Sequence, residues 1–311
     1  MKHHAVILAG DKKYGRKAPP SEVGRFLSAI EPAVEKSLAM SIEGRSTLSY
    51  KPAWLTKAAD IRFIEITGRQ ETILHFEART IGEAYPKLFD QQEMWSTKPD
   101  EKSTGFDVFS SVLSHVTKGM KDSDRFDRQL LGSIEKFSPV LNGKYQRIEI
   151  SGAGSQQVIS SIDEDTIAKA SDLKSLTPQP QMVKLAGILD MIRWSNQSFG
   201  LKLSNGETVY GILMHDDVDS IKAFGQKKII IEGKAIFRPS GKLLRIETYT
   251  AALGEDAPKL WEKVPKPISK PIDRRKFVRK QTSTNGVNAY FGKWPGDESE
   301  EELLALLEAS A

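Results

Sequence analysis

In the first half of the chain, short apolar or alternating stretches are separated by longer stretches in which apolar residues recur three or four positions apart. The first pattern is typical of strands with a buried face, and the second of amphipathic helices. Strands are predicted at four places, 5–10, 59–67, 71–79 and 144–151. Helices are predicted at three, 21–38, 106–119 and 125–141. We therefore expect an α+β domain over residues 1–152, followed by a linker with a short helix at 153–180.

Two irregularities are visible in this pattern. Pro32 lies inside the first predicted helix, where it is expected to bend the helix or end it early. The strands at 59–67 and 71–79 are close enough along the chain to form a hairpin. In the first of them the alternation slips by one residue between Phe63 and Ile64, which indicates a β-bulge.

The clearest fold signal lies at 181–252, where five strand-like stretches and one short helical stretch at 215–224 follow each other in the order β-β-β-α-β-β. Asn205-Gly206 is a strong signal for a hairpin turn between the second and third strands. Glycines within strands suit the sharp bends of a coiled barrel, and three are placed in this way: Gly187, Gly211 and Gly233. This order predicts an all-β OB-like small barrel, although an SH3-like barrel also fits.

Charge is distributed unevenly along the C-terminal part of the chain. The 311 residues carry 45 Lys and Arg against 41 Asp and Glu, a formal net charge of only +4. Residues 253–286 are predicted to be a basic, Pro-rich linker, in which 259–280 hold nine Lys or Arg and two acids. Residues 294–311 hold six acids and no base. We therefore expect an acidic, flexible tail at 287–311, with a short helix where leucines recur at helical spacing.

Composition excludes several classes of protein. With 39% hydrophobic and 28% charged residues, the chain can bury a core and stay in solution. It has no cysteine, which excludes disulfides, thiolate metal sites and a cysteine nucleophile. No stretch approaches the roughly 18 apolar residues of a membrane span, and the first residues do not form a secretory signal. We therefore expect a cytoplasmic protein that contacts no membrane.

Motifs for catalysis are weak throughout the chain. The glycine-rich segment 152–156 lacks the Gly-Lys-Ser/Thr of a phosphate-binding loop and does not form the Gly-x-Ser-x-Gly turn of a serine hydrolase. The five histidines are scattered, and His215-Asp216-Asp217 is typical of a helix N-terminus rather than of a metal site. A metal-dependent hydrolase built on His215 is the remaining enzymatic alternative. We expect a non-enzymatic protein without metal or cofactor.

Nucleic-acid binding is one function open to such a barrel, because exposed rings can stack on bases while cations follow the phosphates. Phe199 and Phe237 are further rings, which fit a barrel core equally well. Residues 182–250 balance ten bases against seven acids, so the barrel is not strongly basic. The candidate nucleic-acid-binding residues are Arg193, Trp194, Lys202, Tyr210, Lys234 and Arg238 in the barrel, with Arg274, Arg275 and Lys276 in the basic linker.

The tail suggests a different function. The sequence Phe-Gly-Lys-Trp-Pro-Gly-Asp-Glu-Ser at 291–299, followed by an acidic leucine-rich stretch, resembles the Trp-Pro-Gly-Asp-Glu peptide of small bacterial proteins encoded beside PIN-domain ribonuclease toxins. The rest is similar to uncharacterised bacterial proteins with an α+β domain and a barrel carrying Gly-Lys-Ala-x-Phe-Arg-Pro-Ser-Gly, here at 233–241. The resemblance implies an antitoxin-like protein whose tail binds and masks a toxin nuclease.

Physical chemistry is compatible with that role. A nuclease groove lined with cations attracts an acidic peptide, a tryptophan can anchor it in a pocket, and leucines on a helix can dock in an apolar groove. The alternative is that the tryptophan and leucines pack on this chain's own first domain or on a second copy. The predicted partner-binding residues are Phe291, Trp294, Pro295, Gly296, Asp297, Glu298, Leu303, Leu304 and Leu307.

Overall fold

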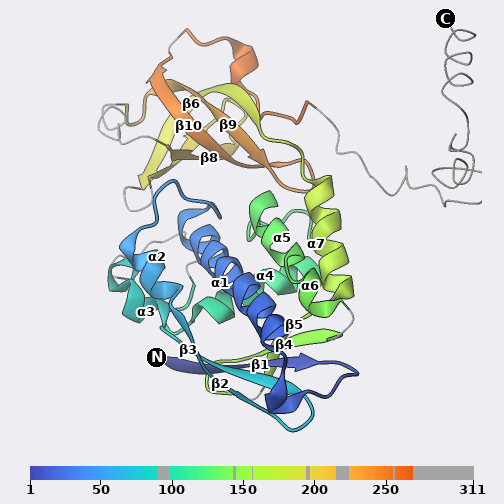
Figure 1. The fold of residues 1–311 in the computed structure, drawn as a ribbon. Coiled ribbons are helices and arrows are strands. Elements are labelled where there is room, and N and C mark those ends of the chain that lie inside the picture. The colour runs from blue at the N-terminus through green and yellow to red at the C-terminus, as the bar shows by residue number, and fades with distance from the viewer. Residues whose placement is uncertain are drawn as a thin grey trace, which may run out of the picture. The chain divides into compact units, whose positions relative to one another are not determined.

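The computed structural model describes residues 1–89, 99–142, 145–155, 157–193, 197–214, 224–254 and 256–268. These residues form an α+β part, with helices on one face of a sheet, followed by a closed five-stranded barrel (Figure 1). The predicted order of an α+β region and then a small barrel is therefore confirmed. Residues 215–223 of the helix expected at 215–224, and the whole tail expected at 287–311, lie outside the described residues.

The sheet of the α+β part is built from strands that are distant in sequence. Its order is β2-β3-β1-β4-β5, and every neighbouring pair is antiparallel. The bulge expected in the first hairpin is confirmed by a register shift between Phe63 and Glu65. The strands are β1 (Lys2–Ala9), β2 (Ile61–Thr67), β3 (Thr72–Ala78), β4 (Arg147–Ser151) and β5 (Val158–Asp163).

Helices cover one face of this sheet (Figure 1). The first runs through Pro32 without ending there, and Gly44 in a left-handed conformation ends it. The segment expected to be one helix at 125–141 is divided in two, because Pro139 has no N–H to continue the first helix. The α-helices are α1 (Pro20–Glu43), α2 (Ala53–Ala58), α3 (Ile81–Ala84), α4 (Gly105–Thr117), α5 (Arg128–Glu135), α6 (Ser138–Leu141) and α7 (Glu164–Leu176).

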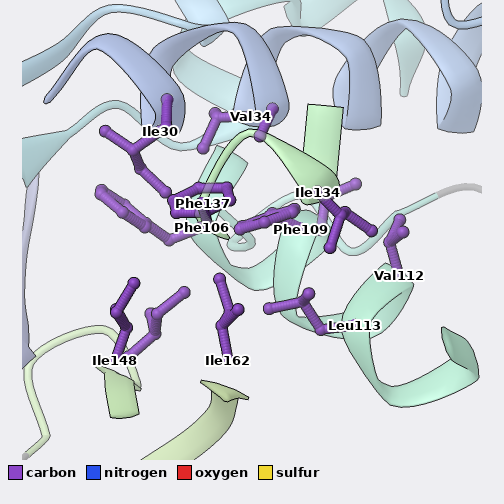
Figure 2. Close-up of a cluster of buried hydrophobic side chains, with 14 of the residues drawn as sticks. Ile30, Val34, Phe106, Phe109, Val112, Leu113, Ile134, Phe137, Ile148 and Ile162 are labelled. Atoms are coloured by element: carbon purple, nitrogen blue, oxygen red, sulfur yellow. The ribbon is translucent and has the colours of Figure 1, made fainter. Parts of the chain in front are cut away.

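The core of the α+β part lies between the helices and the sheet. Figure 2 shows Ile30 and Val34 of α1 facing the rings of Phe106, Phe109 and Phe137, with side chains of β4 and β5 below them. The rings of Phe109 and Phe137 are stacked with their centroids 6.0 Å apart. All of these side chains are 1% exposed or less, so they account for much of the burial that holds the part together.

The segment expected to be a linker with a short helix differs from that expectation. Residues 158–163 form the fifth strand of the sheet, and Ile162 is fully buried in the core (Figure 2). The short helix is α7, which Asp163 caps by accepting a hydrogen bond from the Thr166 amide, and which packs on α4 and α5. Along the chain, residues 177–180 link α7 to the first strand of the barrel.

The barrel has the strand order β10-β8-β7-β6-β9 and is closed by pairing of β9 with β10. Among the described strand pairs of the barrel, only β8–β10 is parallel. Asn205-Gly206 forms the predicted turn between β7 and β8, with Gly206 at φ +85°. The strands are β6 (Gln181–Arg193), β7 (Ser198–Lys202), β8 (Thr208–Leu213), β9 (Lys228–Phe237) and β10 (Leu243–Leu253).

Two of the predicted strand glycines allow a close approach inside the barrel. A Cβ atom on Gly211 would lie 2.2 Å from the buried ring of Phe199, and one on Gly233 would lie 2.3 Å from the Glu247 carbonyl oxygen on β10. A side chain at either position would therefore overlap a neighbour. Glycine is required there because the strands and the core ring pack so tightly.

A buried ion pair joins the barrel to the α+β part. Asp127 caps α5 through the amides of Gln129 and Leu130, and its carboxylate also accepts hydrogen bonds from Ser46 and from Arg245 on β10, the latter at 3.1 Å. Asp127 and Arg245 have side chains that are 5% and 8% exposed. Burial alone would raise the pKa of Asp127, but Arg245, the Ser46 hydroxyl and the amides outweigh it and lower this pKa.

Candidate nucleic-acid interface

The outward surface of β6, β7 and β8 carries an exposed aromatic side chain beside a glycine. Gly200 lies opposite Tyr210 on β8 and opposite Met191 on β6. The Tyr210 side chain is 58% exposed. A Cβ atom on Gly200 would lie 3.3 Å from Thr208 Cγ2 and 3.6 Å from Met191 Cβ, so these two side chains cover the buried glycine. The result is an exposed tyrosine ring on a face that also carries a methionine and a threonine.

A second row of outward residues runs across four strands next to this ring. Thr208 on β8 lies opposite Lys202 on β7, Lys202 opposite Ile188 on β6, and Ile188 opposite Lys228 on β9. Residues directly opposite one another share a face of the sheet. We call Ile188, Met191, Gly200, Lys202, Thr208 and Tyr210 the platform.

Of the residues predicted to bind nucleic acid, the structure places three on this surface. Lys202 and Tyr210 belong to the platform, and Arg193 lies on the same face at the end of β6, opposite Ser198. In the described part of the chain Lys202 makes no ion pair. Phe199 and Phe237 are 0% and 1% exposed, so neither ring can stack on a base, and Phe199 belongs to the barrel core.

The other predicted residues do not join the platform. Lys234 lies on β9 between Met182 and Glu247, beyond β6 from the tyrosine. Arg238 lies in the turn between β9 and β10, whose Lys242 forms a 2.8 Å ion pair with Asp122 of the α+β part. Trp194, Arg274, Arg275 and Lys276 lie outside the described residues, as do all nine predicted partner-binding residues.

One end of this surface is covered by the α+β part. Ile212 on β8 is only 4% exposed, and a Cβ atom on Gly44 would lie 3.6 Å from its Cδ1 atom. The neighbouring strand β10 carries Arg245, which is buried against Asp127. The open part of the surface is therefore the end that holds Tyr210, Lys202 and Thr208.

The chain after the barrel folds back along it, and we call residues 256–268 the strap. A 3-10 helix at Lys259–Glu262 contacts β6, and Trp261 lies 5.7 Å from the Lys184 ammonium, measured to the ring centroid. The Gln181 side chain donates to the Lys266 carbonyl at 2.7 Å and accepts from the Ile268 amide at 2.9 Å. The side-chain amide of Gln181 thus pairs with the strap as a neighbouring strand would.

The strap also contacts the row of outward residues that includes Lys202 and Lys228, a contact that was not predicted from the sequence. Glu262 accepts a 2.7 Å hydrogen bond from the Lys228 ammonium. Hydrogen bonds from Lys228 and Ser204 lower the pKa of the Glu262 carboxyl, so it is ionised. Ser204 follows Lys202 in the turn between β7 and β8. No local sequence pattern marks these residues, because Glu262 is one of only two acids in the basic stretch 259–280.

Charges near the platform are mixed. Asp190 is the extra residue of a bulge in β6, between Leu189 and Met191, and Glu207 lies in the β7–β8 turn. Both are exposed. The platform is therefore not a strongly positive surface, and any polyanion that binds there gains from ring contacts as much as from charge.

Other kinds of site find little support among the described residues. In that part of the chain no group of three or more His, Asp and Glu side chains could hold a metal ion. No helix that the structure describes has the length and apolar character needed to span a bilayer. No family model, curated protein or solved structure matches the chain. The residues of the barrel are therefore the basis on which a function can be inferred.

Proposed function

We propose that the barrel binds single-stranded nucleic acid on the platform. The strand order, with the third and fifth barrel strands parallel, supports an OB-like assignment of this barrel. In OB folds the face of the second and third strands binds oligonucleotides. Here that face is formed by β7 and β8, and it holds the exposed ring of Tyr210.

The observation that carries the proposal is the exposed ring of Tyr210 on the face of β7 and β8. The ring is 58% exposed, so a flat base can stack on it, and the side chains of Thr208 and Met191, which cover Gly200, lie next to it on the same face. Such stacking contributes about 1 to 3 kcal/mol per base and is tolerant of sequence, because every base has a π face. Lys202 lies where it can contact a phosphate next to the stacked base.

The test measures binding of a labelled single-stranded oligonucleotide of about 12 nucleotides by fluorescence anisotropy at low salt. Tyr210→Ala should weaken binding by about 5- to 150-fold, the equivalent of removing one stacked base. Tyr210→Phe should bind nearly as well as the wild type, because it keeps the ring. Tyr50→Ala is the matched control, since Tyr50 is 79% exposed but belongs to the α+β part. Equal affinities for Tyr210→Ala and Tyr50→Ala would refute the platform.

A second function, protein binding by the tail, is supported by sequence alone. We propose that residues 287–311 bind a protein partner with a cationic groove, and that this partner is a PIN-type ribonuclease, as the resemblance implies. The acidic stretch without a base, together with Trp294 and the leucines, favours it. Co-expression with the product of the neighbouring gene tests the idea. Loss of co-purification on deletion of 287–311 is expected, and unchanged co-purification would refute the tail as the interface.

A further inference from the structure

The strap holds an acidic side chain against the barrel at the edge of the proposed binding surface. The 3-10 helix at Lys259–Glu262 ends with Glu262, whose carboxylate lies 2.7 Å from the ammonium of Lys228. The second group that lowers the pKa of Glu262 is the hydroxyl of Ser204. The barrel thus binds an anion here, and that anion belongs to its own chain.

This anion site continues the row of the platform. Lys228 is in register with Ile188, and Ile188 is in register with Lys202. Ser204 is two residues from Lys202 along the chain. An ammonium and a hydroxyl are donors that a phosphate oxygen accepts as well as a carboxylate oxygen does. A nucleic-acid strand that stacks on Tyr210 and follows Lys202 therefore reaches the position that Glu262 occupies.

We propose that Glu262 competes with nucleic-acid phosphate for Ser204 and Lys228, so that the strap reduces the affinity of the platform. This inference rests on the proposed nucleic-acid function. In the bound state the phosphate takes the place of the Glu262 carboxylate, and the 3-10 helix moves away from β9. The strap thereby makes binding of a short or weakly charged ligand unfavourable, while a strand that also contacts Tyr210 and Lys202 displaces it.

Release of this contact needs no change in the barrel. Lys228 and Glu262 have side chains that are 31% and 16% exposed, and ion pairs near the surface contribute little to stability. The strap keeps other anchors when Glu262 moves, namely the Gln181 hydrogen bonds and the packing of Val264 against the barrel core. The one-turn helix is the part that has to shift.

Glu262→Gln in the full-length chain tests the proposal with the same labelled oligonucleotide. The affinity should rise by about 3- to 10-fold at low salt, the effect of one additional phosphate contact. Asp256→Asn is the matched control, because it removes the same charge from the strap without a partner on β9. Lys228→Gln combined with Glu262→Gln should cancel the gain. A gain of equal size in Asp256→Asn would overturn the proposal, since it would reflect net charge alone.

Hydrogen exchange of the strap gives an independent readout. Saturating oligonucleotide should speed exchange of the amides at 259–262 in the wild-type protein, and Glu262→Gln should speed it without ligand. Slower or unchanged exchange on binding would overturn the proposal while leaving the nucleic-acid function intact. Absence of binding by both the wild type and Glu262→Gln would instead refute the proposed function, and this inference with it.

Discussion

At the scale of single residues, glycines give opposite predictions depending on their surroundings. Gly211→Ala should destabilise the barrel by about 1 to 3 kcal/mol, because the new methyl group would meet the Phe199 ring at 2.2 Å. Gly24→Ala should stabilise the protein by about 1 kcal/mol, because Gly24 lies exposed in α1 with no atom within 4 Å of its added Cβ. Urea denaturation of both variants measures the two changes. A stable Gly211→Ala protein would contradict the packing described for the barrel.

His4 gives a prediction on pH. Its ring is 2% exposed, and its nitrogens lie 3.0 Å from the Ser151 carbonyl and 2.9 Å from the Thr104 hydroxyl. Burial lowers the pKa of His4 below 6.5, and the charges of Lys2 and His3 also lower it. The Ser151 carbonyl and the Asp107 charge raise this pKa, but they offset the lowering only in part. The unfolded chain therefore binds a proton near pH 6.5 that the folded chain does not bind until lower pH.

The free energy of unfolding should consequently fall as the pH drops from about 7 to 5, with at most about 1.4 kcal/mol per pH unit from this group. His4→Leu should be less stable at pH 8, because it leaves the Thr104 hydroxyl with one partner fewer, but its acid slope should be smaller. His115 contributes in the same direction, since burial, followed by Arg125, lowers its pKa. Urea titrations of the wild type and His4→Leu at each pH measure the two slopes.

At the scale of elements, the contact of Asp127 with the barrel can be separated from its role as a helix cap. Asp127→Ala should destabilise the protein by about 2 to 4 kcal/mol, because it removes the cap of α5 and one of two carboxylates that face the buried Arg245, which keeps Glu247 at 3.0 Å. Asp163→Ala removes a cap of similar geometry from α7 but no buried ion pair, and should cost about 1 kcal/mol. Equal losses in thermal or urea denaturation would mean that the Arg245 pair adds nothing.

Elements with a strong apolar period could be predicted from the sequence. The barrel strands, the turn at Asn205-Gly206 and the bulge at Phe63 were read from alternation and turn residues, which depend on neighbours along the chain. The fifth strand of the sheet was missed, because Ser160 and Ser161 give it little apolar character. Its place depends on pairing with β4 and on Ile162, the one side chain it sends into the core.

The candidate site shows the same limit. Tyr210 and Lys202 could be nominated from residue type and strand period alone, and they do share a face. The position of Arg238 at the junction with the α+β part could not be predicted. It depends on a turn that packs near Asp122, more than 100 residues away in the chain. The role proposed for Glu262 could not be predicted either, because it depends on the strand register that aligns Lys228 with the platform.

At the scale of the whole molecule, all the described residues belong to one compact unit that ends at Pro271. A protein truncated after Pro271 should therefore keep the thermal stability of the full chain. It lacks Arg274, Arg275 and Lys276, so its oligonucleotide affinity should depend less steeply on salt, by about 0.7 in the logarithmic slope for each phosphate that these cations no longer neutralise. Deletion of 287–311 alone keeps these cations and should keep the slope. An unchanged slope after truncation at Pro271 would exclude Arg274, Arg275 and Lys276 from binding.

The hydrogen bond that Gln181 donates to Lys266 and the one it accepts from Ile268 determine where the rest of the chain leaves the barrel. Because that point is fixed beside β6, a molecule captured by the downstream residues is tethered to the platform and meets it at an effective concentration on the order of millimolar. If both proposed functions hold, two individually weak sites on such a tether give high avidity for a ligand that offers features to both. Replacing Gln181 with alanine would loosen that tether without altering either site.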